Sequence, residues 1–160
     1  MQKITLISVG KLKEQFFKDA EKEYLKRLKG FCSFELCEIS AETLPQNPSD
    51  SQIEASLLVE AEKIISKIPK NAEVISLCIE GKLHSSEELS SIILENANFG
   101  SGNICFIIGS SYGLAQKVKA LSKVRLSMSK MTFPHRLARV MLLEQIYRAY
   151  KILGGGEYHK

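Results

Sequence analysis

Hydrophobic and polar positions alternate along the chain with two different periods, and the change of period separates strands from helices. Short apolar runs predict strands, whereas apolar residues three to four positions apart predict helices. The predicted strands cover 3–9, 31–39, 73–78, 103–108 and a short segment at 124–127. The predicted helices cover 14–29, 51–66, 85–96, 114–121 and 134–153. Strands and helices therefore follow one another from end to end.

Polar and turn-forming residues mark the boundaries between these elements. Residues 80–84 predict a turn out of the third strand. Ser51, with Glu54 three residues later, predicts a capping box at the start of the second helix. Ser85 or Ser86 is expected to cap the third helix.

The regular alternation of strand and helix predicts an α/β fold. Strands that are apolar along nearly their whole length are typical of a parallel sheet with helices on both faces. The chain has no repeat and no linker, so residues 1–160 are expected to form a single domain. Ligands of such sheets bind where loops leave the carboxyl ends of strands. Three loops in the second half of the chain qualify, after Cys78, Ile108 and Ser127.

The loop after Ile108 is a turn with glycine at both ends, Gly109-Ser-Ser-Tyr-Gly113. Its backbone can approach a ligand closely, although a tight turn between strand and helix needs glycine in any case. The chain has no glycine-rich phosphate loop, and no Gly-x-Gly-x-x-Gly follows the first strand. Ordinary nucleotide-binding proteins and the common open-sheet methyltransferases are therefore disfavoured.

The loop from Ser127 to His135 combines two methionines, a phenylalanine and a lysine with small hydroxyl residues. An apolar loop that also forms hydrogen bonds suits a ligand with a flat ring and a thioether chain. Simple packing of the loop under the last helix explains the same residues equally well.

Composition is that of a soluble protein, with 44% hydrophobic and 25% charged residues. No apolar stretch has the length of about 20 residues that a membrane span needs, and the N-terminus carries no evident secretory signal. We therefore expect a cytoplasmic protein. The four cysteines lie in apolar runs without metal-ligand spacing, so we expect reduced core thiols and no metal site.

Charge is unevenly distributed along the chain. Residues 1–100 carry 12 basic and 16 acidic side chains, whereas residues 101–160 carry 10 basic and 2 acidic ones. This asymmetry favours a basic surface for a polyanion, the alternative being an ordinary solvated surface. On the last helix, four cations accompany the single acid Glu144, which favours contact with RNA phosphates. These cations are Arg136, Arg139, Arg148 and Lys151.

Apolar side chains lie nearly all the way round the last helix, from Leu137 to Tyr150. A helix of this kind is buried on more than one side, either inside the core or in a subunit interface. Because a second copy of the chain easily covers a terminal helix of so small a domain, the pattern favours a symmetric dimer.

Four strings of residues carry a resemblance to a known family. They are Phe106-Ile-Ile-Gly-Ser-Ser-Tyr-Gly-Leu114, Leu126-Ser-Met-Ser-Lys-Met-Thr-Phe-Pro-His135, Glu144-Gln-Ile-Tyr-Arg-Ala149 and Tyr158-His-Lys160. They closely resemble the ribosomal RNA large subunit methyltransferase H family, which belongs to the SPOUT class of α/β-knot methyltransferases. Chain length and element order agree as well, so the resemblance covers essentially the whole chain.

The resemblance implies a fold, a cofactor and a reaction. The fold is a parallel-sheet α/β knot with a C-terminal trefoil knot, which general folding rules would not predict. The cofactor is S-adenosyl-L-methionine, held by the knot loops of a homodimer. The reaction is methylation of N3 of a pseudouridine in 23S rRNA, at the subunit interface of the ribosome.

The resemblance also implies roles for particular residues. Cofactor contacts are expected from Leu77, Gly109, Met128, Ser129, Lys130, Met131, Thr132 and Phe133. RNA binding or catalysis is expected from His135, Arg148, Tyr158 and His159. The chain departs from the family at two points. Ser110 stands where a second glycine is usual, and the tail from Gly154 lacks the usual arginine.

Several mechanisms and functions are consistent with these residues. Arg148 is expected to stabilise the imide anion that forms when N3 loses its proton. His135 or His159 accepts that proton, or neither does and positioning suffices. The alternatives to rRNA methylation are a ribosome-associated RNA-binding protein without activity and a SPOUT enzyme that acts on transfer RNA. Neither alternative accounts for the chain as well: the first leaves the loop at 128–133 unexplained, and the second is disfavoured by the lack of an appended RNA-binding domain.

Overall fold

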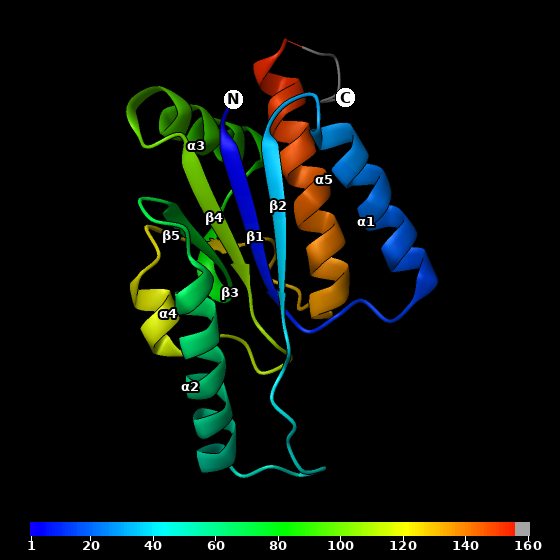
Figure 1. Cartoon of the computed structure of the whole chain (residues 1–160), viewed down its shortest axis with the longest axis vertical. Coiled ribbons are helices and arrows are strands. Elements are labelled where there is room, and N and C mark those ends of the chain that lie inside the picture. The colour runs from blue at the N-terminus through cyan, green and yellow to red at the C-terminus, as the bar shows by residue number, and fades with distance from the viewer. Residues whose placement is uncertain (156–160) are drawn as a thin grey trace.

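The computed structural model describes residues 1–155, in which strands and helices alternate along the chain (Figure 1). The elements, in chain order, are β1 (Lys3–Val9), α1 (Gln15–Leu28), β2 (Ser33–Ile39), α2 (Asp50–Lys67), β3 (Glu73–Leu83), α3 (Ser86–Phe99), β4 (Asn103–Ile108), α4 (Gln116–Ala120), β5 (Val124–Ser127) and α5 (His135–Leu153).

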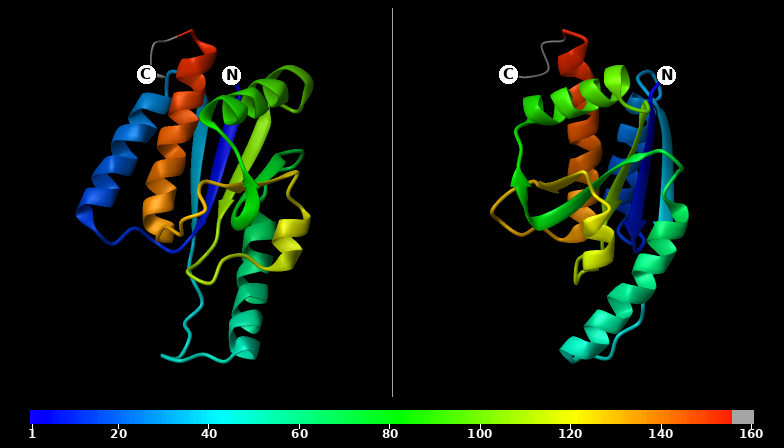
Figure 2. Two further views of the ribbon diagram at one scale, coloured as in Figure 1. Left: turned by 180° about the vertical axis from the view of Figure 1, so that it is seen from behind. Right: turned by 90° about the vertical axis from the view of Figure 1, so that its left-hand side faces the viewer.

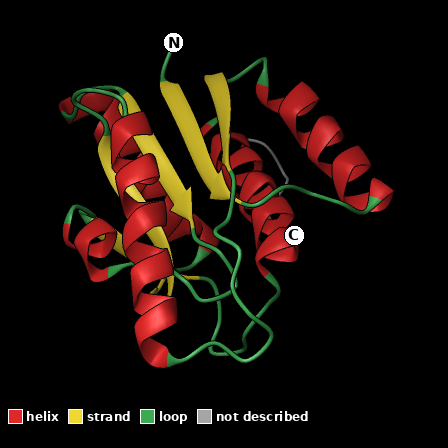
Figure 3. Ribbon diagram, turned by 60° about the horizontal axis from the view of Figure 1, so that its bottom comes forward, coloured by secondary structure: helices red, strands yellow, loops and turns green. Residues whose placement is uncertain are grey.

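The strands form one parallel sheet in the order β2-β1-β4-β3-β5. Helices α1, α3 and α5 cover one face, and α2 and α4 cover the other (Figures 2 and 3). The predicted α/β fold with a parallel sheet is confirmed.

Both faces of the sheet are buried, which explains why the central strands are apolar along their length. In β1, Ile4 and Leu6 belong to the core under α1, α3 and α5, whereas Ile7 and Val9 belong to the core under α2 and α4. All four side chains are completely buried. Successive side chains of one strand thus point to opposite faces of the sheet and pack into two separate cores.

The capping box of α2 lies two residues earlier than predicted. Ser49 is the N-cap, and its hydroxyl accepts a hydrogen bond from the Gln52 backbone N–H. The Ser49 backbone N–H in turn donates to the Gln52 side chain at 2.9 Å. Two Ser-x-x-Glu/Gln patterns overlap here, and the prediction based on Ser51 is wrong. At α3 the predicted cap is confirmed: Ser85 is the N-cap, and with Glu88 it forms a capping box.

Strand β3 is longer than predicted, because the expected turn at 80–84 is instead part of a strand. Both Leu77 and Lys82 pair with Leu126 of β5, so the register shifts between them. A Cβ atom at Gly81 would lie 2.5 Å from the Arg125 carbonyl oxygen. Glycine therefore allows the two backbones to approach closely after the irregularity.

Helix α5 packs between α1 and α3, and this position accounts for much of its apolar circumference within one chain. Leu142, Leu143 and Ile146 are completely buried. Leu137 and Met141 are only half-buried. The dimer therefore stays a prediction.

The cysteines mostly occupy core positions, as expected. All four are free thiols, with Cys32, Cys78 and Cys105 buried and Cys37 half-buried. Burial raises the pKa of the Cys32 thiol to about 11 and that of Cys105 to about 12, which makes both poor nucleophiles. Within residues 1–155, no helix is both long and apolar enough to cross a membrane.

Candidate functional site

A pocket of about 840 Å³ lies at the carboxyl edge of the sheet, where the three predicted loops come together. Its wall consists of residues from the end of β3, the loop after β4, and the segment from β5 into α5. They are Leu77, Cys78, Ile79, Glu80, Ile108, Gly109, Ser110, Ser111, Tyr112, Gly113, Leu114, Lys119, Leu126, Ser127, Met128, Ser129, Met131, Thr132, Phe133, Pro134, His135, Arg136 and Ala138.

The turn after β4 is closed by its own backbone. The Gly113 N–H donates to the Ser110 carbonyl oxygen at 2.9 Å, and Gly113 has a φ of 87°. A Cβ atom at Gly109 would collide with the Gly113 carbonyl group and lie 2.9 Å from Leu114 Cγ. Glycine at position 109 therefore has a steric reason, and the backbone itself forms this part of the pocket wall.

Ser110, which stands where the family usually has glycine, forms a hydrogen bond with a side chain of α2. Its hydroxyl donates to Glu60 Oε2 at 3.0 Å. Glu60, on α2, is 2% exposed, and its other oxygen accepts a hydrogen bond from the Glu42 backbone N–H at 3.0 Å. The substitution thus gives a buried carboxylate a second partner and ties the turn to α2.

The loop after β5 is ordered by hydroxyl side chains. Ser127 Oγ donates to the Ser129 carbonyl oxygen at 3.1 Å, and the Met131 backbone N–H donates to Ser129 Oγ at 3.0 Å. Met131 is 74% exposed, whereas Met128 and Phe133 are half-buried against the pocket. The loop combines apolar surface with satisfied polar groups, as predicted.

His135 opens α5 and is half-buried at the rim of the pocket. Its Nδ1 lies 3.5 Å from Ser111 Oγ, and its Nε2 faces Gly10 at the end of β1. Burial lowers the pKa of His135, and repulsion from Arg136 and Arg139 lowers it further, while Glu14 opposes the shift. The imidazole is therefore neutral at physiological pH.

The lowered pKa of His135 predicts a pH effect on stability. Below about pH 6.5 the unfolded chain takes up a proton at this position more readily than the folded chain. Stability is therefore lost as the pH falls from 6.5 toward the folded pKa. We expect the melting temperature to fall more steeply over this range in wild type than in His135→Asn. Equal slopes between pH 5 and 8 would show that the environment of His135 is not as described.

The pocket wall also holds an ion pair. Lys119 of α4 contacts Glu80 of β3, and this hydrogen bond lowers the pKa of Glu80. The carboxylate therefore stays charged beside the backbone irregularity of β3. The loop after Cys78 was predicted as one of the three ligand-binding loops, but Cys78, Ile79 and Glu80 were not named individually as site residues.

Two arginines of α5 that we expected to contact RNA are engaged within the chain. Arg136 Nη1 lies 2.8 Å from Glu14 Oε1. Arg139 is 2% exposed, and it pairs with Glu21 of α1 and, at 2.8 Å, with Glu38 of β2. The prediction of an RNA contact is wrong for Arg139, because acids distant in the sequence bury it.

The charge asymmetry of the sequence is also largely neutralised by the fold. Of the ten basic residues in 101–160, six form ion pairs with carboxylates among the described residues, and all but one of these carboxylates lie in the first hundred residues. The six are Lys117, Lys119, Lys123, Arg136, Arg139 and Arg148. Ion pairs within the described residues therefore offset much of the positive charge of the C-terminal third.

The predicted site residues divide into three groups. Leu77, Gly109, Met128, Ser129, Met131, Thr132, Phe133 and His135 all line the pocket. Lys130 is exposed and does not line it, and Arg148 lies 13 residues beyond His135 on α5, about 20 Å along the helix axis. Arg148 pairs there with Glu144 at 2.7 Å. Tyr158 and His159 lie outside the described residues.

The fold and the pocket define a class, an α/β protein with a pocket at the carboxyl edge of a parallel sheet. A family model described as "Predicted SPOUT methyltransferase" matches residues 2–159. "Ribosomal RNA large subunit methyltransferase H" of Bacillus pumilus is 43% identical, and the protein of the same name from Clostridium botulinum is 49% identical. Each alignment covers 98% of this chain and 99% of the relative.

The chain therefore belongs to the ribosomal RNA large subunit methyltransferase H family of SPOUT methyltransferases. It is a methyltransferase, and the alternative of an RNA-binding protein without activity is set aside. A solved structure described as a probable methylase family protein from Haemophilus influenzae is 14% identical, with a TM-score of 0.49 over 95% of this chain and 66% of that one.

Proposed function

We propose that the chain transfers a methyl group from S-adenosyl-L-methionine to N3 of a pseudouridine in 23S rRNA of the assembled ribosome. The observation that carries the proposal is the pocket, in which seven of the eight predicted cofactor residues meet. Family membership supports the methyl transfer, and the names of the relatives support a large-subunit rRNA substrate.

The residues of the pocket fit the proposed cofactor. Its volume of about 840 Å³ is in the range of small-molecule sites, and glycine at position 109 lets the turn after β4 close tightly so that its backbone lines the pocket. Met128 and Phe133 offer apolar surface to a flat ring, and Glu80 offers a carboxylate to positive charge. When bound, the cofactor supplies an electrophilic methyl group on its sulfonium.

Within this proposal, the described residues orient the reactants and provide a place for a proton. The uracil-type N3–H must lose its proton before or during attack, since its pKa lies well above neutrality. His135, neutral and at the rim of the pocket, is one candidate acceptor, and His159 is the other. The walls formed by the three loops exclude water and keep the nucleophile at attack distance.

Arg148 takes part in this reaction only if a second copy of the chain is present. Its distance of about 20 Å along α5 from His135 places it away from the pocket of its own chain. We therefore propose a homodimer in which Arg148 of one copy approaches the pocket of the other and stabilises the developing imide anion. The half-buried Leu137 and Met141 leave apolar surface on α5 for such a contact.

The test is methyl transfer from labelled S-adenosylmethionine to whole ribosomes, free 23S rRNA and bulk tRNA, all lacking the modification. We expect label in ribosomes, at a single pseudouridine. Label in tRNA alone would show that the substrate is tRNA instead of rRNA, while the protein would still be a methyltransferase. Absence of label, together with absence of cofactor binding in calorimetry, would reject the proposal.

The same assay decides the role of the histidines. His135→Ala and His159→Ala are each compared with wild type at saturating ribosome concentration. If the residue accepts the proton, we expect a loss of about 100-fold or more in kcat for that variant. Near-normal turnover in both variants would assign catalysis to positioning and to Arg148.

The proposal includes the remaining features that the family implies. These are one domain over residues 1–160, a C-terminal trefoil knot and a cytoplasmic location, where ribosomes are found.

A further inference from the structure

Helix α1 carries a row of exposed lysines that the sequence analysis did not single out. The row consists of Lys18, Lys22, Lys26 and Lys29, all exposed. At 3.6 residues per turn these positions fall within about 80° of the helix circumference, and they extend over about 16 Å of its length. We refer to them as the α1 lysine row.

The α1 lysine row lies beside the side of α1 that packs against the core. Leu28 is completely buried, and Tyr24 and Leu25 pack against the core shared with α3 and α5. Around the helix axis Leu28 and Tyr24 lie about 120° and 160° from the middle of the row, whereas Leu25 lies beside Lys18 at its edge. The row therefore flanks the buried side of α1, and its four lysines are exposed.

The acids of α1 have hydrogen-bond or ion-pair partners outside the row, although Lys26 lies close enough to Glu23 to help lower its pKa. Glu21 pairs with the buried Arg139, and Glu14, just before the helix, pairs with Arg136. Glu23 is 2.9 Å from Arg27, and Asp19 accepts a hydrogen bond from the Gln15 side chain. None of the four lysines forms an ion pair with a described residue.

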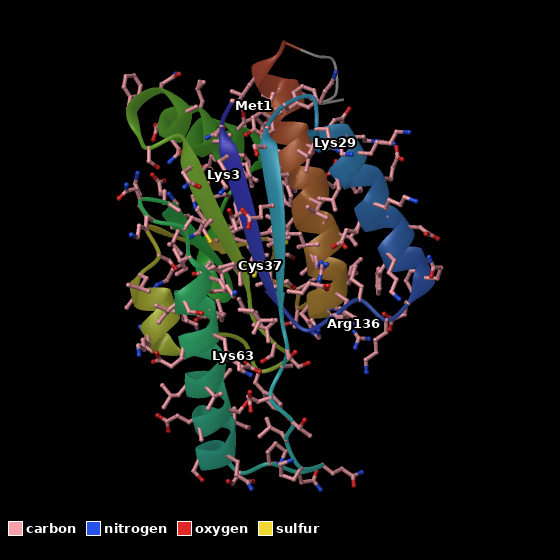
Figure 4. All side chains as sticks on the ribbon, in the orientation of Figure 1. Met1, Lys3, Lys29, Cys37, Lys63 and Arg136 are labelled. Carbon is pink, nitrogen blue, oxygen red and sulfur yellow. The ribbon has the colours of Figure 1, made fainter. Side chains whose placement is uncertain are left out.

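The row extends away from the pocket. Gly10 faces His135 at the pocket rim, and the exposed Lys11 and Lys13 follow it directly in the segment that leads to α1. The Arg136–Glu14 ion pair joins the start of α1 to the start of α5. In Figure 4, Arg136 and Lys29 lie at opposite ends of α1. The lysines therefore connect the pocket edge with the far end of the molecule.

We infer that the α1 lysine row binds the phosphate backbone of the RNA substrate outside the pocket. Exposed ammonium groups spaced along one side of a helix, none in an ion pair with a described residue, suit a linear polyanion and carry no sequence information. A membrane surface is disfavoured, because Phe16, the exposed large apolar residue of α1, projects from another side of the helix. The inference rests on the proposed function for the identity of the RNA.

The test compares two variants with the same change in net charge. Lys22→Gln/Lys26→Gln removes two lysines of the row, and Lys67→Gln/Lys70→Gln removes two exposed lysines elsewhere. For the row variant we expect the KM for ribosomes to rise on the order of tenfold with kcat unchanged. The slope of log KM against log salt concentration should fall by about 1.4 to 1.8, for two lost phosphate contacts. Lys22→Arg/Lys26→Arg should restore both.

The control decides between a local and a general effect of charge. Equal increases in KM in both double variants would show that KM depends only on the net charge of the protein, which would overturn the inference. An unchanged KM and salt slope in the row variant would also overturn it. If wild type does not methylate ribosomes, the proposed function fails. The inference about the row is then tested by filter binding to single-stranded RNA, in which the row variant should lose affinity and the control variant should not.

Discussion

Gly109→Ala is expected to weaken binding of S-adenosylmethionine by about ten- to a hundredfold. The added methyl group meets the Gly113 carbonyl group and Leu114 Cγ, so the turn that forms the pocket wall must move. Overpacking of this kind costs about 1–3 kcal/mol, and part of that cost appears in ligand affinity, because the displaced backbone lines the site. Calorimetric titration of the variant with the cofactor measures the effect.

A matched variant separates this steric effect from glycine replacement in general. At Gly30 a Cβ atom meets nothing within 4 Å, so Gly30→Ala should bind the cofactor as wild type does. Circular dichroism should show that both variants fold. Wild-type affinity in folded Gly109→Ala would mean that the turn does not contact the cofactor.

Arg139→Met is expected to destabilise the chain by about 3 kcal/mol. The guanidinium is 2% exposed and joins α5 to α1 and β2 through Glu21 and Glu38. Its removal leaves two carboxylates without their partner, and breaking a buried pair in this way costs about 3–5 kcal/mol. The lower end applies because Glu38 is one-third exposed. Equilibrium denaturation in urea measures the change.

Two further variants test whether the lost charge is the cause. Lys117→Met breaks an ion pair in which both side chains are more than half exposed, and it should cost less than about 1 kcal/mol. Adding Glu21→Gln and Glu38→Gln to Arg139→Met should recover part of the lost stability, because the carboxylates no longer need a counter-charge. A loss for Arg139→Met no larger than that for Lys117→Met would contradict the burial of this pair.

Much of the fold could be predicted because it depends on local pattern. The bounds of β1, β4 and β5 agree with the sequence prediction. For β1 and β4 the reason is that a buried parallel strand is apolar along most of its length. The location of the pocket could also be predicted, because the carboxyl ends of parallel strands share one edge. The β3 irregularity was missed, since nothing in residues 78–83 identifies β5 as the pairing partner.

Pairings between distant residues could not be predicted from the sequence. Arg139 was considered beside Glu144, its neighbour on the same helix, whereas its partners come from residues about a hundred positions earlier. The role of Glu60 was missed for the same reason, because only the fold brings α2 to the turn at Ser110. In each case the sequence shows the charge or the hydroxyl group but not the residue that approaches it.

The strand order has a consequence for how the chain is made. Ile4 of β1 pairs with Ile104 of β4, so β1 lacks its inner neighbour until a hundred more residues have been synthesised, about 5–20 s at usual rates. Helix α5, which covers the same face, follows all five strands in the sequence. Contacts so distant in sequence also close slowly. The apolar strands therefore remain exposed until α5 has been synthesised, and we expect the growing chain to depend on chaperones until then.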